Sequence, residues 1–118
     1  MSPLSRPDFE DVWERLDAEA QAAKFSHEAL LRLTDFYRRL DDEDRRVVDE
    51  TLASWVLEGD ERRRFDALAL IDEFGIRCAL PALEADLARL ADAVGASVPT
   101  DRAKLERIIA DLRLNAQP

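Results

Sequence analysis

The sequence predicts an all-α protein of about six helices, packed either as stacked antiparallel hairpins or as an irregular helical bundle. Apolar residues recur at spacings of three and four along most of the chain, which is typical of amphipathic helices. No segment alternates apolar and polar residues for long enough to predict a strand. Only three glycines and five prolines interrupt the 118 residues, so we expect long helices joined by short connections.

The first two helices are predicted over residues 7–23 and 26–40. Pro7 suits the first turn of a helix, and the acidic residues that follow it suit the positive end of the helix dipole. Ser26 is the expected N-cap of the second helix. The expected buried stripes are Phe9, Val12, Trp13, Leu16 and Ala20 in the first helix and Leu30, Leu33, Tyr37 and Leu40 in the second.

The next two helices are predicted over 43–58 and 61–74. Asp41 or Asp42 caps the earlier one, and Gly59 follows it where a left-handed residue is favoured. Asp60 caps the later one, and Gly75 ends it. We expect the 61–74 helix to be central, with neighbours on two sides, because more than half of its circumference is apolar: Phe65, Ala67, Leu68, Leu70, Ile71 and Phe74.

The last two helices are predicted over 80–94 and 101–114, with a loop over 95–100. Pro81 lies in the first turn of the 80–94 helix. The most regular stripe in the chain belongs to this helix: Leu80, Leu83, Leu87, Leu90 and Val94. The final helix presents Leu105, Ile108, Ile109 and Leu112.

Two segments, 28–36 and 66–74, share a pattern of acidic, alanine, leucine and phenylalanine positions at an offset of 38 residues. Amphipathic helices also produce such matches by chance. An alanine-rich helix over 62–71, the turn Gly75-Ile76-Arg77 and the helix start Ala79-Leu80-Pro81 together resemble a HEAT-type unit. The resemblance covers 61–94 well and 26–58 less well. It implies a short α-α superhelix of stacked hairpins whose exposed faces bind other macromolecules.

The length fits one domain, so we expect a single domain over 1–118 with flexible ends at 1–6 and 115–118. No apolar run has the length of a membrane span or the form of a signal peptide, and one cysteine forms no internal disulfide. We therefore expect a cytoplasmic protein that does not bind membranes.

The net charge of −9 is concentrated in the first half of the chain. Residues 1–60 contain 16 acidic and eight basic residues, whereas residues 61–118 contain ten and nine. Nucleic acids are unfavourable partners for such a chain, because their binding depends on cations that meet phosphates. Another protein, basic in character, is the favoured partner.

Catalytic and metal-binding patterns are absent from the sequence. His27 is the only histidine and is expected to be exposed in the first turn of its helix. Cys78 is expected to be a small buried apolar residue, and activation at a helix N-terminus is the alternative. We expect no enzymatic activity, no metal and no cofactor. A small enzyme would instead need carboxylates that converge in a deep pocket.

Acidic residues gather at the ends and along the outer face of the helix predicted over 43–58. They either form a solvated surface or steer a basic partner toward the chain. This set is the candidate partner-binding site: Asp41, Asp42, Glu43, Asp44, Asp49, Glu50, Glu58, Asp60 and Glu61.

The favoured function is a non-catalytic protein-binding module. In size, acidity and helical fold the chain resembles the small immunity proteins of bacterial toxin systems, which implies a basic toxin as the partner. The alternative is a structural or self-associating helical scaffold, or an accessory domain, which would use the apolar remainder of the fourth and sixth helices and could form a homo-oligomer.

Trp13 and Trp55 are expected in the core. Arg62, Arg63 and Arg64 either pair with the acids of the third helix or contact an anion or a partner.

Overall fold

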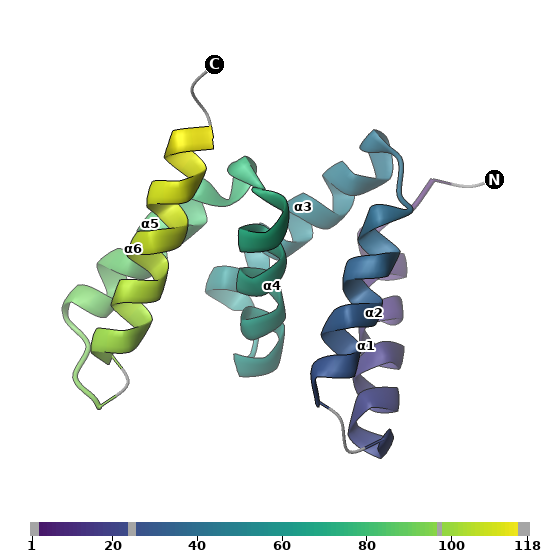
Figure 1. Cartoon of the computed structure of the whole chain (residues 1–118), viewed down its shortest axis with the longest axis horizontal. Coiled ribbons are helices and arrows are strands. Elements are labelled where there is room, and N and C mark those ends of the chain that lie inside the picture. Colours follow the sequence, from purple (N-terminus) through teal and green to yellow (C-terminus); the bar gives the residue numbers. More distant parts are fainter. Residues whose placement is uncertain (1–2, 24–25, 97, 116–118) are drawn as a thin grey trace. The chain divides into compact units, whose positions relative to one another are not determined.

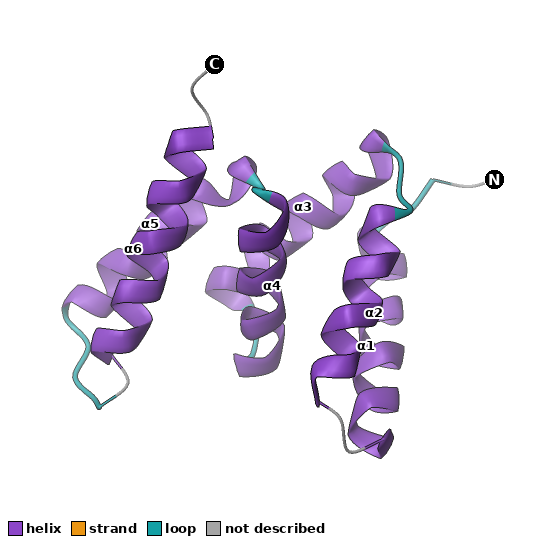
Figure 2. Ribbon diagram, viewed as in Figure 1, coloured by secondary structure: helices purple, strands orange, loops and turns teal. Residues whose placement is uncertain are grey.

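The computed structural model describes residues 3–23, 26–96 and 98–115. Over these ranges the chain forms α-helices, one short 3-10 helix and no strand, which confirms the all-α prediction (Figure 2). The elements along the chain (Figure 1) are α1 (Arg6–Ala23), α2 (Ser26–Arg38), α3 (Asp42–Glu58), α4 (Glu61–Phe74), η1 (Arg77–Ala79), α5 (Leu80–Ala91) and α6 (Val98–Asn115).

The chain divides into two compact units, residues 1–51 and 52–118, and the boundary falls inside α3. The first unit contains α1, α2 and the beginning of α3. The second contains the end of α3 and all later elements. A single domain over 1–118, the HEAT-like stacking and the internal repeat stay predictions.

In the first unit α1 and α2 pack side by side (Figure 1). Trp13 is in the core, as predicted, and is 4% exposed. Ser5 caps α1, because its hydroxyl accepts a hydrogen bond from the Asp8 N–H at 3.3 Å while the Asp8 carboxylate accepts one from the Ser5 N–H at 3.1 Å. The core side chains of this unit are Phe9, Trp13, Leu33, Tyr37 and Val48. The side chains of Ala20, Ser26 and His27, for which predictions were made, lie outside the described residues.

In the second unit α5 and α6 form an antiparallel pair, and α4 also contacts α6. Arg113, near the end of α6, bonds Glu84 in the first turns of α5 at 2.5 Å, which fixes the antiparallel sense. Trp55 is 2% exposed and confirms its predicted core position. The other large core side chains are Leu52, Val56, Leu68, Leu70, Ile71, Ile76, Leu83, Leu105, Ile108, Ile109 and Leu112.

The two glycines that follow helices have different roles. Gly75 adopts φ 62° and ψ 49° after α4, and its N–H donates to the Ile71 carbonyl, so the predicted left-handed C-cap is confirmed. Gly59 has no positive φ, so the same prediction for it is wrong. A Cβ at Gly59 would lie 2.7 Å from the Trp55 carbonyl oxygen, so close backbone approach is what requires a glycine there.

Two apolar residues predicted to be buried are exposed. α5 ends at Ala91, three residues before the predicted end, and Val94 is fully exposed in the connection to α6. Phe65 in α4 is 56% exposed, although neighbouring positions of the same helix are buried. The apolar side of α4, which we expected neighbours to cover on two sides, is therefore uncovered at Phe65.

We predict that Gly75→Ala lowers the free energy of unfolding by about 1 kcal/mol or more, because alanine is strained at positive φ. Gly95→Ala is the control, since a Cβ there would meet only a Val98 methyl at 3.7 Å. Urea unfolding followed by circular dichroism measures both. Equal effects of the two substitutions would contradict the assigned role of Gly75.

Candidate functional site

The acidic residues at the start of α3 are partly structural. Asp41 caps α3, because its carboxylate accepts a hydrogen bond from the Asp44 N–H at 2.8 Å. Asp44 in turn accepts a hydrogen bond from the Leu4 N–H at 3.0 Å, which attaches the chain before α1 to the start of α3. Both carboxylates therefore have partners within the first unit, and their availability to another protein is reduced.

Asp49 lies on the inner side of α3 and not on its outer face. Its Oδ1 accepts a hydrogen bond from the Tyr37 hydroxyl at 2.7 Å, and the Arg45 guanidinium lies over the Tyr37 ring, 5.1 Å from its centroid. Burial raises the pKa of the Asp49 carboxyl above its ordinary value, while the Tyr37 hydrogen bond opposes that shift. Asp49 is therefore a half-buried partner of α2, which corrects its placement on the outer face.

Asp42, Glu43 and Glu50 are exposed. Asp42 and Glu50 are eight residues apart, and the exposed Arg46 lies midway between them. Asp42, Arg46 and Glu50 therefore follow one stripe of the helix surface. Glu43 lies next to this stripe. We call Asp42, Glu43 and Glu50 the α3 acidic face; together with the exposed N-cap Asp41 they are the part of the predicted site that the first unit presents to solvent.

The remaining three predicted site residues belong to the second unit. Glu58 is exposed at the end of α3. Asp60 caps α4 and accepts hydrogen bonds from the Arg63 N–H at 2.9 Å and the Arg63 guanidinium at 2.7 Å. The backbone hydrogen bond from Arg63 is the largest cause that holds the pKa of Asp60 below its ordinary value. Glu61 lines a pocket on α4.

Two arginines at the start of α4, Arg63 and Arg64, each pair with an acid outside α3. Arg63 pairs with the capping Asp60, and its guanidinium lies 5.7 Å from the centre of a Trp55 ring. Arg64 pairs with Asp86 of α5. These two partners lie before α4 and in α5, whereas the sequence analysis expected the acids of α3.

Asp86 is a buried carboxylate that the sequence analysis missed. Its side chain is 2% exposed and binds two guanidinium groups, one from Arg64 and one from Arg89. Asp86 lies three residues after Leu83 and four before Leu90, hence on the apolar stripe of α5. An acid on such a stripe indicates a buried polar partner, and this spacing could have revealed the site.

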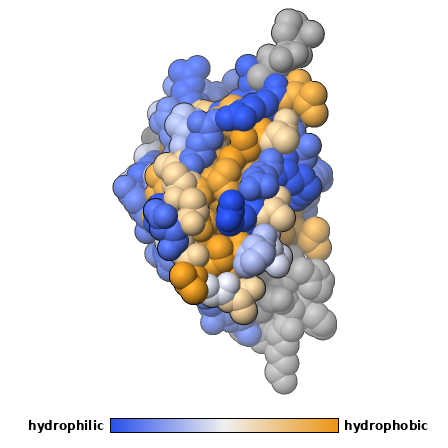
Figure 3. Space-filling view, turned by 90° about the vertical axis from the view of Figure 1, so that its left-hand side faces the viewer, coloured by the Kyte–Doolittle hydropathy of each residue, from blue (hydrophilic) through white to orange (hydrophobic). Residues whose placement is uncertain are grey.

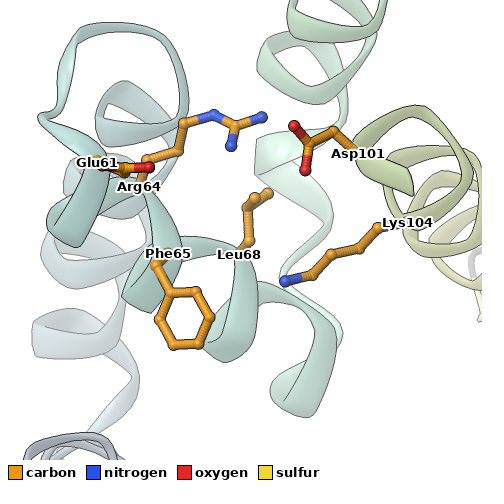
Figure 4. Close-up of a pocket in the computed structure, with 6 residues that line it drawn as sticks. All are labelled: Glu61, Arg64, Phe65, Leu68, Asp101 and Lys104. Atoms are coloured by element: carbon orange, nitrogen blue, oxygen red, sulfur yellow. The ribbon is translucent and has the colours of Figure 1, made fainter. Parts of the chain in front are cut away.

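A small pocket lies between α4 and α6 in the second unit. It has a volume of about 170 Å³, below the range of about 300–1,000 Å³ typical of small-molecule sites. Figure 4 shows the side chains that line it: Glu61, Arg64, Phe65 and Leu68 from α4, and Asp101 and Lys104 from α6. The Lys104 ammonium lies 5.1 Å from the centre of the exposed Phe65 ring, so this aromatic side chain has a cation as its neighbour.

A larger open groove runs between α5 and α6, with a volume of about 510 Å³. Figure 3 views the side of the molecule where these helices lie and shows an apolar band flanked by hydrophilic side chains. The apolar lining comprises Leu87, Ala88, Ala91, Ile109 and Ala110, and the charged lining comprises Glu84, Arg102, Glu106 and Arg113. We call this feature the α5–α6 groove.

Other candidate chemistry is limited within the described residues. Cys78 is exposed in η1, so the expected burial of its thiol is wrong. No group of three His, Cys, Asp or Glu residues lies close enough to hold a metal ion in the part of the chain that the structure describes. No helix among the described residues is both long and apolar enough to cross a membrane.

No protein-family model, no curated protein and no solved structure matches this chain.

We predict that the effect of Asp49→Asn on the free energy of unfolding depends on pH. Because the folded-state pKa of Asp49 is raised, wild-type stability falls as pH rises from the unfolded pKa of about 3.9 through the folded pKa. Asparagine keeps an acceptor for the Tyr37 hydroxyl but carries no charge. The free energy of unfolding of the variant, relative to wild type, should therefore increase between about pH 3 and about pH 7.

Urea titrations at several pH values measure this difference. Glu50→Gln, at the exposed neighbouring position, is the control for a general loss of one charge. A difference that stays constant across the whole pH range would contradict the burial of the Asp49 carboxyl.

We predict that Asp86→Ala lowers the free energy of unfolding by about 2–3 kcal/mol, because it removes two charge-assisted hydrogen bonds and leaves Arg64 in a partly buried position. Arg89→Ala should lower it by less than about 1 kcal/mol, since the Arg89 side chain is 57% exposed. Thermal or urea unfolding measures both. Equal losses for the two variants would show that burial does not strengthen the cluster.

Proposed function

We propose that this chain is a non-catalytic protein-binding module whose α3 acidic face binds a basic partner. The observation that supports the proposal is the exposure of Asp42, Glu43 and Glu50 in a unit that carries 14 acidic and eight basic residues. Like charges gathered on one unit create a potential that attracts a basic surface and raises its rate of association.

The linings of the two pockets agree with a binding role. Neither the pocket on α4 nor the α5–α6 groove is lined by a histidine, cysteine, serine or threonine. Nucleophilic catalysis most often uses serine, cysteine or threonine, and acid–base catalysis most often uses histidine, with carboxylates and lysine as the other common groups. The carboxylates in both linings are accompanied by arginine or lysine, an arrangement suited to polar contacts with another protein.

Within this class we propose a toxin-neutralising role. The size, the acidity and the all-α fold support it, as they do the resemblance to small immunity proteins. The partner would be a basic toxin domain whose cationic surface, built to meet phosphates, meets the carboxylates of α3 instead. Co-expression with the captured partner tests this role, since the chain should relieve toxicity that the partner causes alone.

Binding should depend on the α3 acidic face and on salt. We predict that the triple variant Asp42→Asn, Glu43→Gln, Glu50→Gln slows association with the basic partner about tenfold at low salt. The partner is first captured from an extract of the source cells on the immobilised chain. Its association rate is then measured at about 50 mM and about 500 mM salt.

A matched control separates this face from net charge. Asp11→Asn, Glu14→Gln and Asp92→Asn together remove the same charge from exposed positions elsewhere. The control should associate at close to the wild-type rate. Equal slowing of both triple variants, or a partner that high salt does not release, would overturn the acidic-face proposal.

A second candidate function is a helical scaffold or accessory domain, which the α5–α6 groove supports. Four of its five apolar lining residues, Leu87, Ala88, Ala91 and Ala110, are partly or fully exposed, whereas Ile109 is buried. Such a surface binds through apolar contact, which salt leaves intact or strengthens. Retention of a partner at high salt, together with its loss on Ala88→Arg, would favour this function over the first.

A further inference from the structure

The α5–α6 groove has a self-complementary rim. Two acidic and two basic side chains line it, so its formal charge is zero although the whole chain carries −9. A strongly basic or strongly acidic partner gains little from a neutral rim. A surface that itself carries both acidic and basic side chains complements a rim of this kind.

The order of these charges along α6 decides which surface fits. Glu106 and Arg113 both line the groove and are seven residues apart, about 10.5 Å along the helix. The midpoint between them falls between Ile109 and Ala110. When a second α6 lies antiparallel across this midpoint, each Glu106 faces the Arg113 of the other copy, and each Ile109 faces an Ala110. Arg113 already bonds Glu84 of its own chain at 2.5 Å, so in the dimer its guanidinium would serve both carboxylates.

The groove lining allows two helices to approach closely. Ala88, Ala91 and Ala110 line it as exposed residues with short side chains. Helices whose contact positions carry small side chains pack at the short end of the usual interaxial range of about 8–10 Å. The apolar area that such a contact buries comes from these alanines and from the partly exposed Leu87, since Ile109 is 5% exposed and belongs to the core.

We propose that the α5–α6 groove is the interface for a second copy of this chain, joined about a two-fold axis that passes between Ile109 and Ala110 of antiparallel α6 helices. A contact of this kind is isologous: the same residues serve both copies, and it closes as a dimer. This proposal rests on the scaffold function and names a second copy of the chain as the partner that binds in the groove. It does not depend on the α3 acidic face.

The dimer should dissociate when a charge enters the groove. Ala88→Arg places an arginine among apolar side chains and should raise the dimer dissociation constant at least about tenfold. Ala85→Arg is the matched control, an exposed alanine on the same helix that does not line the groove. Sedimentation equilibrium over a series of concentrations measures the dimer dissociation constant of the wild-type chain and of both variants. Circular dichroism checks that both variants keep their helices.

A charge exchange tests the antiparallel arrangement. Glu106→Arg alone sets two arginines against each other at both ends of the contact. Arg113→Glu alone sets two glutamates against each other and also removes the bond to Glu84 within the chain, so circular dichroism must show that this variant keeps its helices. Each variant should therefore dimerise more weakly than wild type. Mixed in equal amounts, the two variants restore opposite charges at both positions and should form a heterodimer more readily than either forms a homodimer.

Three results would overturn the proposal: a wild-type chain that stays monomeric up to about 1 mM, equal effects of Ala88→Arg and Ala85→Arg, or no heterodimer in the mixture. The scaffold function is tested apart from self-association. If wild type is monomeric while Ala88→Arg still releases a partner that binds at high salt, the scaffold stands and self-association fails. If Ala88→Arg also leaves that partner bound, both fail.

Discussion

The buried carboxylate of Asp86 is the interaction on which the arrangement of the second unit depends. It joins α4 to α5 through Arg64, and it holds Arg89 from its own helix. An unpaired carboxylate at this depth would be strongly unfavourable, so α5 is stable in its place only when the Arg64 guanidinium reaches it. The pairing also fixes the rotation of α5 about its axis. With Leu83 and Asp86 directed inward, Ala88 and Ala91 are left on the surface. The composition of the α5–α6 groove is thus a consequence of where one acid is buried.

The parts of the fold that local chemistry determines could be predicted from the sequence. α4 has the bounds expected of it, because Asp60 at its start and Gly75 at its end act within a few residues of themselves. Positions that depend on tertiary packing were harder. The regular leucine spacing of α5 predicts a buried stripe through Val94, yet the helix ends at Ala91, and only Leu83 of that stripe is fully buried. The exposure of Phe65 was unpredictable for the same reason. It depends on whether a neighbouring helix covers that side of α4, and the spacing of apolar residues within α4 does not contain this information.

The acidic candidate site was predictable as a composition but not as a surface. Six of its nine residues gather in the sequence because a helix start favours carboxylates. Four of the nine, Asp41, Asp44, Asp49 and Asp60, accept hydrogen bonds that hold local structure. Neither charge nor spacing separates a capping carboxylate from an exposed one before the helix ends are placed. The residues left for a partner, Asp42, Glu43 and Glu50, are those whose side chains point away from the core of the first unit.

The two proposed surfaces depend on salt to different degrees, and this follows from how charge is distributed. The first unit has 14 acidic and eight basic residues, against 12 and nine in the second. Salt screens the attraction between the α3 acidic face and a cationic partner. It also screens the repulsion between two copies of an acidic chain, and it leaves the apolar contacts of the groove intact or strengthens them. Raising the salt concentration should therefore release a basic partner. Self-association should respond less, because salt weakens its Glu106–Arg113 attractions but also reduces the net repulsion and keeps the apolar contacts.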